Sequence, residues 1–254
     1  MSNAKKFPLI EAIFELHWGE IAGRFNYTEN EQYFFPGRLS VAASNKKYKL
    51  IERIPNQPSF PKFVTHRFRE KENSWPCFQL GLGIFTINQV NDGYNWATFK
   101  DTIKEGLEIF QEAEPLKLEA EKSSLSINLR YQDAFFPDSE NSIEDYLNDH
   151  FNIKTQLPPN FSDDLRLSKK FSSINLRIDI DSLIPKGIVS IIISNALINN
   201  KPGLLMETMI SVGADEVYNE KTSFDAIMDW VENAHDIQKH AFNTLINPSA
   251  YEKE

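Results

Sequence analysis

The stretch from residue 8 to residue 18 reads Pro8-Leu-Ile-Glu-Ala-Ile-Phe-Glu-Leu-His-Trp18, and its even-numbered positions after Pro8 are all apolar. This alternation is typical of a β-strand that buries one face. The other face carries Glu11, Glu15 and His17, which could offer carboxylate and imidazole ligands to a metal ion. Alternation alone also predicts a solvated outer face, and we favour that interpretation.

Beyond this strand, helix and strand signals follow an order that occurs twice. In the first half, the capping pattern Thr28-x-x-Glu31 predicts a short helix that ends before Pro36. Strand patterns follow at 62–71 and 77–90, and Asn95 can cap a long helix. The second half has a strand at 124–136, a short helix after 142, strands at 171–181, 187–199 and 203–212, and a last helix from 222 or 223.

The repeated order predicts an α+β fold formed by internal duplication. We expect the halves to span 1–114 and 115–254 within one continuous globular unit. Short connections between successive strands favour one curved antiparallel sheet. Long helices would pack on one face of this sheet, in a saddle-like or helix-grip arrangement.

Composition is that of an ordinary globular protein, with 41% hydrophobic residues among 254 and as many as 19 Phe, which predicts an aromatic-rich core. The lone cysteine, Cys77, excludes an intramolecular disulfide and favours a reducing compartment. The first eight residues do not resemble a signal peptide, and the most apolar stretch, 187–198, is too short to span a membrane. We therefore expect a cytoplasmic protein.

Charge is unevenly distributed along the chain. The net charge is −9, yet residues 38–72 hold nine Lys or Arg against three acids, so this basic segment is +6 and the remainder −15. Four aromatic residues interleave with these cations, a composition that also suits single-stranded nucleic acid, although the overall acidity disfavours it. The segment could equally dock on the chain's own acidic half or on an acidic protein partner. The candidate surface residues are Lys46, Lys47, Lys49, Arg67 and Arg69.

A possible anion site lies on the polar face of the later strands. The tetrapeptide Ile-Asn-Leu-Arg occurs at 127–130 and again at 174–177, which suggests neighbouring strands. Two arginines side by side could grip a phosphate or carboxylate, and the candidate ligand-binding residues are Asn128, Arg130, Asn175 and Arg177. A cross-strand ladder of Arg with Asp179 and Asp181 is the simpler alternative, and we favour it.

Strong catalytic signals are missing from the sequence. It has no P-loop, dinucleotide-binding glycine pattern, zinc-protease pattern, Cys-x-x-Cys or Gly-x-Ser-x-Gly elbow. We expect no cofactor and no metal. His235 and His240 differ by about 140° around a helix, so we interpret His235 as a partly buried structural histidine, and Cys77 as a packed side chain.

Several short segments, in order along nearly the whole chain, resemble a sporadically distributed family of uncharacterised prokaryotic proteins. They are Pro8-Leu-Ile-Glu-Ala-Ile-Phe-Glu15, Phe78-Gln-Leu-Gly81 with Phe85-Thr-Ile-Asn88, Tyr94-Asn-Trp96-x-x-Phe99, Leu129-Arg-Tyr131 and Ala234-His235. The chain departs from the family pattern at Gln132-Asp133, where Ile-Asn is usual. The resemblance implies no activity or catalytic residue, and the family's patchy occurrence is similar to that of defence and toxin–antitoxin genes.

These observations favour a non-enzymatic binding module that acts with a protein partner encoded nearby, in a prokaryotic defence or toxin–antitoxin-like system. One alternative is a receptor for a nucleotide or other small ligand that uses the Arg130/Arg177 face. A second is a metal-dependent hydrolase or nuclease built on Asp179 and Asp181, whose side chains point the same way on a strand.

Overall fold

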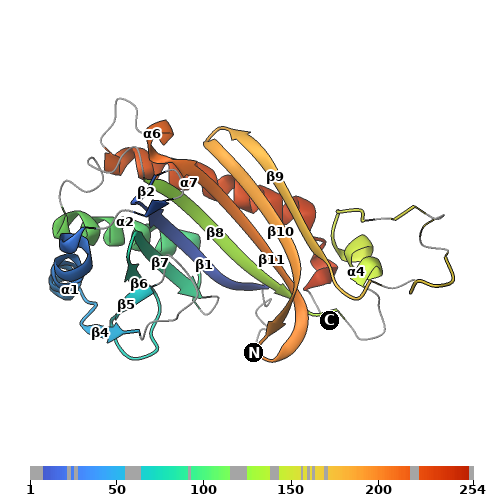
Figure 1. Cartoon of the computed structure of the whole chain (residues 1–254), viewed down its shortest axis with the longest axis horizontal. Coiled ribbons are helices and arrows are strands. Elements are labelled where there is room, and N and C mark those ends of the chain that lie inside the picture. The colour runs from blue at the N-terminus through green and yellow to red at the C-terminus, as the bar shows by residue number, and fades with distance from the viewer. Residues whose placement is uncertain are drawn as a thin grey trace.

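The computed structural model shows a large antiparallel sheet with helices on one face (Figure 1). Two long helices, α2 (Trp96–Ala113) and α7 (Ser223–Leu245), lie along that face and contact each other. The coarse α+β class predicted from the sequence is therefore confirmed. The structure describes residues 8–21, 24–25, 28–54, 64–90, 93–114, 125–137, 143–155, 157–158, 161, 164–168, 171–217 and 223–251.

Nine strands form the sheet in the order β4-β5-β6-β7-β1-β8-β11-β10-β9, and every pairing is antiparallel. The two central strands, β1 and β8, come from the two halves of the chain and pair directly, so both halves contribute to one sheet. The bounds are β1 Leu9–His17, β4 Leu50–Arg53, β5 Val64–Arg69, β6 Cys77–Gly81, β7 Ile84–Val90, β8 Ser126–Phe135, β9 Asn175–Leu183, β10 Lys186–Ile198 and β11 Lys201–Gly213; β2 (Glu20–Ile21) and β3 (Arg24–Phe25) form a separate ribbon.

Shorter helices complete the helical layer. A π-helical turn, η1 (Asn30–Phe34), runs directly into α1 (Phe35–Asn45), which packs on α2 and β5. The expectation of a helix that ends before Pro36 is wrong, because Pro36 lies in the first turn of α1, where a backbone N–H has no helical partner to lose. The other short helices are α4 Ile143–His150, α6 Ala214–Val217 and the 3-10 turn η2 Pro248–Ala250.

The hydrophobic core lies between the sheet and its helices. The apolar face of β1 supplies Ala12, Phe14 and Leu16, and Trp18 follows directly after the strand; all four are fully buried. Trp18 meets Phe110 of α2 edge to face, with ring centroids 5.5 Å apart, an arrangement that aromatic quadrupoles favour. The aromatic-rich core predicted from composition is confirmed, since Phe makes up most of the large, fully buried side chains.

Local signals fixed the ends of several elements. Asn95 caps α2 as predicted, because its side chain accepts a hydrogen bond from the Thr98 backbone N–H at 3.3 Å. The β10–β11 connection places Asn199 and Asn200 at positive φ, which suits the tight hairpin turn that joins these long strands. No helix in the described ranges is long and apolar enough to cross a bilayer.

Candidate functional site

The sheet face opposite the helices, called the polar face below, carries a charged cluster across its centre. Arg130 of β8 donates to Glu15 of β1 at 2.6 Å and to Glu207 of β11 at 3.4 Å. Gln132 also donates to Glu207, and Asn128 donates to Glu15. Two carboxylates therefore flank one guanidinium, and an anionic ligand of Arg130 would have to compete with both of them.

Glu15 is the electrostatic centre of this cluster. Burial alone would raise the pKa of its carboxyl, but the hydrogen bond from His17 and the charge of Arg130 outweigh burial and hold the pKa at about 2. Only 6% of Glu15 is exposed, so our expectation of a solvated outer face is wrong at this position. The reason is that long polar side chains from the neighbouring strands lie over the carboxylate.

The two predicted arginines lie on the same face, with two strands between them. β11 and β10 separate β8 from β9, so our expectation that Arg130 and Arg177 lie on neighbouring strands is wrong. Arg177 lies on the edge strand β9, where it donates to Asp179 at 2.9 Å, two residues along its own strand. Asn175 is exposed at the start of the same strand. Asn128 and Arg130 meet through Glu15, and the structure does not bring Asn175 or Arg177 to them.

The basic segment 38–72 is partly paired within the chain. Lys46 and Lys47 lie 3.2 and 3.4 Å from Glu108 and Glu105 of α2, so part of the segment does dock on the chain's own acids, although these precede the C-terminal half. Lys49 is exposed and Arg67 is half-buried. The loop 55–63, with two of the four aromatic residues, lies outside the described residues.

Arg69 is the one member of the predicted surface set that the fold clearly buries. Only 5% of it is exposed, because its guanidinium pairs with Glu52 at 3.1 Å and lies over the Trp75 ring. The positive charge of Arg69 is therefore paired within the part of the sheet formed by the first half of the chain. Placing Arg69 on an accessible partner surface was wrong.

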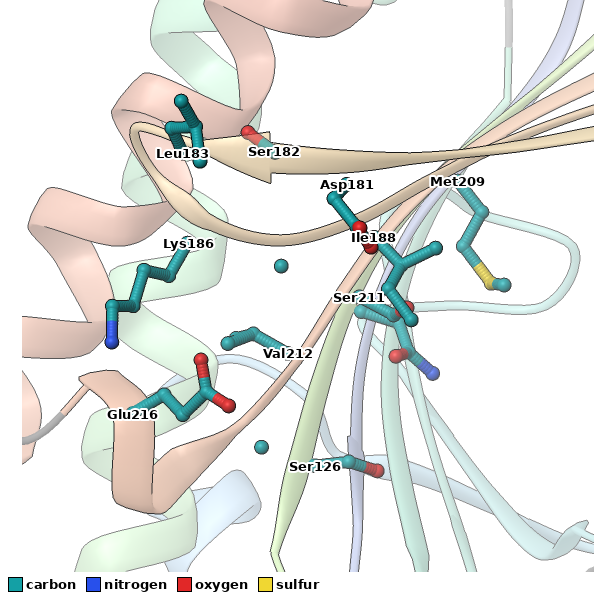
Figure 2. A pocket seen from close by; sticks show the side chains of 13 residues that line it. Ser126, Asp181, Ser182, Leu183, Lys186, Ile188, Met209, Ser211, Val212 and Glu216 are labelled. Atoms are coloured by element: carbon teal, nitrogen blue, oxygen red, sulfur yellow. The ribbon is translucent and has the colours of Figure 1, made fainter.

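A groove of about 700 Å³ lies at the end of β9, β10 and β11 and is called the strand-end groove (Figure 2). Ser126 and Glu216 lie at one end of it, and Asp181 and Met209 at the other. Asn128, from the predicted anion site, also lines it. Among the described residues, no lining side chain of this groove has a buried polar atom that lacks a partner.

A second cavity, of about 440 Å³, lies on the other side of the sheet and is called the helix-side cavity. It is enclosed by the start of β1, the turn that precedes α2, the distal end of β8 and one face of α7. Its volume falls within the range of small-molecule sites. The lining residues are Pro8, Leu9, Tyr94, Asn95, Trp96, Tyr131, Asp133, His235, Gln238, Lys239, Phe242 and Asn243.

Tyr94, Tyr131 and His235 form a hydrogen-bonded chain along the wall of this cavity. The Tyr94 hydroxyl donates to the Tyr131 hydroxyl at 3.1 Å, and the Tyr131 hydroxyl lies 2.9 Å from Nδ1 of His235. Burial lowers the pKa of His235 to about 4, so the ring is neutral at pH 7. The Tyr131 hydroxyl accepts from Tyr94, and toward Nδ1 it donates or accepts according to the tautomer of His235.

The indole ring of Trp96 stacks on the imidazole ring of His235. The two rings stack with centroids 3.7 Å apart and an interplanar angle of 11°. The Trp96 indole N–H donates to Glu232, which also accepts from Lys100 at 2.6 Å. The N-terminal turn of α2 is thereby tied to α7, and the aromatic wall of the cavity is held in place by both helices.

Asp133 is the unexpected member of the lining. It lies on the helix side of β8, is only 3% exposed, and its Oδ2 has no hydrogen-bond partner among the described residues. Burial raises the pKa of its carboxyl to about 7. A buried carboxyl without a partner is costly, and such groups are uncommon outside functional sites.

The lining holds both acceptors and donors, since Asp133 offers carboxyl oxygens and Asn95, Gln238, Lys239 and Asn243 offer N–H groups. Neither tyrosine hydroxyl bonds to Oδ2 of Asp133, because that atom has no hydrogen-bond partner among the described residues. The acceptors beside Asp133 are its own carboxyl oxygens and a lone pair of the Tyr94 oxygen. A bound molecule that brings N–H or O–H donors would satisfy these groups.

Sequence reasoning passed over this cavity, although the strand pattern contained a signal for it. Leu125, Ile127, Leu129 and Tyr131 alternate with polar residues along this stretch, and the same period of two places Asp133 next on that apolar face. His235 is partly buried as predicted, yet it also lines a cavity. Four segments that carry the family resemblance, around residues 8, 94, 131 and 235, meet here.

Metal and thiol chemistry find little support elsewhere in the structure. No group of three or more His, Cys, Asp or Glu that could hold a metal ion occurs in the part of the chain that the structure describes. Cys77 is fully buried, and burial raises the pKa of its thiol to about 12, which agrees with its interpretation as a packed side chain.

Comparisons with protein-family models, with curated proteins and with solved structures found no match to this chain.

Proposed function

We propose that this protein binds a small organic molecule in the helix-side cavity. The cavity has the volume, the aromatic wall and the few convergent polar groups that characterise such sites. This proposal keeps the receptor alternative from the sequence and moves its site from the Arg130/Arg177 face to the opposite side of the sheet.

The observation that carries the proposal is the unpartnered Oδ2 of Asp133. On the opposite face of the sheet, by contrast, the charges of Arg130 and Glu15 pair with each other. Asp133 lines a cavity, and its cross-strand neighbours, Met206 and Leu9, are apolar and provide no partner for its carboxyl. A ligand that hydrogen-bonds to this carboxyl would remove a cost that the unliganded fold carries.

A thermal-shift screen against a metabolite panel, read together with native mass spectrometry, tests the proposal. The variant Asn243→Trp places a large ring at the exposed rim of the cavity, and Asn233→Trp places the same ring at an exposed site of α7 that does not line it. We expect compounds that raise the Tm of the wild type and of N233W but not of N243W. Equal shifts in all three proteins, or none with any compound, would refute the proposal.

Partner binding is a second candidate, and a different surface from the basic segment supports it. Apolar residues are exposed at the β9–β10 turn, where Leu183 is 84% and Ile184 81% exposed, and Ile180 is 52% exposed nearby. β9 is also the last strand of the sheet, and an open edge can accept a strand from another chain. Exposed apolar groups of this size often mark protein contacts.

Co-expression with products of neighbouring genes, followed by native mass spectrometry, tests the partner. Leu183→Asp with Ile184→Asp should abolish a complex formed through the β9–β10 turn. Reversing the charges of Lys46, Lys47 and Lys49 should abolish one formed through the basic segment. A complex that tolerates both variants would contradict both surfaces. A role in defence or in a toxin–antitoxin pair rests on the family resemblance alone.

We also propose that the fold arose by internal duplication, with a saddle-like sheet. Support comes from the order of elements, since β1 and β8 are each followed by a helix, further strands and a long helix. In each half the last strand returns to pair with the first, as β7 does with β1 and β11 with β8. An experimental structure in which the two halves superpose poorly would count against the duplication.

A further inference from the structure

We take the helix-side cavity to be a ligand site, as proposed above, and infer that its ligand is a small organic cation with N–H donors, such as a primary amine, an amidine or a guanidine, whose charged end pairs with Asp133.

The carboxyl of Asp133 favours a ligand that donates hydrogen bonds. Oδ2 of Asp133 lacks a partner among the described residues, and the hydroxyls of Tyr94 and Tyr131 bond to each other and, for Tyr131, to His235. A ligand carboxylate or phosphate would face acceptors and a second negative charge in a poorly hydrated site. A ligand with two or more N–H groups can donate to Asp133 and to the Tyr94 oxygen.

The aromatic wall favours the same charge. Tyr94 and Tyr131 meet edge to face, with ring centroids 6.1 Å apart, and Trp96 covers the imidazole beside them. Cations are attracted to the faces of such rings, and aromatic walls beside a carboxylate are a recurrent way to hold ammonium groups. Leu9 and Phe242 supply apolar surface for the body of the ligand.

The other charged groups near the cavity do not reverse this reasoning. Lys239 lines the cavity, but its side chain is exposed, so solvent screens its charge. Glu232 is paired with Lys100, so the charges of these two groups largely offset each other. His235 has its pKa lowered to about 4 and the pKa of Tyr94 is raised to about 12, so across pH 5.5–8.5 Asp133 is the group of this wall that changes charge.

Three probes of matched shape test the charge class: benzamidine, benzamide and benzoate. Isothermal titration calorimetry at pH 8 should show benzamidine binding at least about tenfold more tightly than the other two, the ratio typical of a charge-assisted hydrogen bond. The preference should disappear in Asp133→Asn and persist in Asp181→Asn, which removes a carboxylate from the strand-end groove. In the wild type, benzamidine affinity should fall about tenfold per pH unit below pH 7, as Asp133 takes up a proton.

The outcomes separate the ligand class from the proposed function. Tighter binding of benzamide or benzoate, or benzamidine binding that ignores both pH and Asp133→Asn, overturns the cation while leaving the cavity as a ligand site. If benzamidine does not bind but the metabolite screen yields a ligand blocked by Asn243→Trp, the cation class is again overturned and the proposed function stands. If the metabolite screen also yields no ligand, both the cation class and the proposed function are overturned.

Discussion

Asp133→Asn should stabilise the protein at alkaline pH, because it removes a buried charge and keeps the size of the side chain. The folded-state pKa of Asp133 is about 7 and its ordinary value is 3.8. A raised carboxyl pKa means that the folded state binds the proton more tightly than the unfolded state. The wild type therefore loses stability as pH rises from about 4 to about 7, and the loss is complete above pH 7.

The size of this effect follows from the pKa difference. At 1.36 kcal/mol per pKa unit, ionised Asp133 costs about 4 kcal/mol at pH 8 and nothing near pH 4. The Asn side chain does not titrate, so the stability difference between variant and wild type should grow by that amount over this pH range. A group that is 3% exposed is shielded from solvent, so little of this cost is screened.

Urea denaturation followed by circular dichroism between pH 4.5 and 8.5 measures the difference. Other titrating groups contribute equally to both proteins and cancel in the comparison. A difference that stays constant across this range would refute the reasoning, because it would mean that the Asp133 carboxyl is hydrated or paired in solution.

Three further substitutions probe the framework. Glu15→Gln should cost about 3 kcal/mol at pH 7, because the Glu15 pKa lies at about 2 against an ordinary 4.5; this contribution is present above pH 4.5 and lost as pH falls through 2, and a cost that does not shrink in acid would contradict it. Gly187→Ala should cost about 1–3 kcal/mol, since φ there is +148° and a Cβ would lie 2.4 Å from the Ser211 carbonyl oxygen; an unchanged Tm would show that the strands can separate freely. Tyr131→Phe should cost about 1–3 kcal/mol by leaving Nδ1 of His235 and the Tyr94 hydroxyl without partners, and urea curves that overlay the wild type would count against the hydrogen-bonded chain.

Much of the fold was predictable because its signals are local. Alternation in β1 and β8, the Asn95 cap and the apolar stripe of α2 depend on residues within a few positions of each other. The Pro36 error has the same origin, since a proline that ends one helical turn can also begin another, and only packing on α2 decides between them.

The candidate site was not predictable in the same way, because its parts meet only through the sheet order. A repeated tetrapeptide suggested that Arg130 and Arg177 are neighbours, but strand order depends on which edges the whole sheet buries, and β11 and β10 intervene. The period of two in the strand predicts that Asp133 lies on the apolar face. Alternation cannot show, however, whether a polar residue on that face meets a partner or a cavity.

The pairing of β1 with β8 has a consequence for how the molecule could respond to a ligand. Leu9 and Trp96 come from the first half of the chain, and Asp133 and His235 from the second, so the helix-side cavity straddles the line where the halves join. Neither half, expressed alone, contains a complete cavity. If the chain is divided within 115–124, the two fragments should therefore bind each other more tightly when a ligand is present. A ligand in the cavity would contact both halves and hold them together.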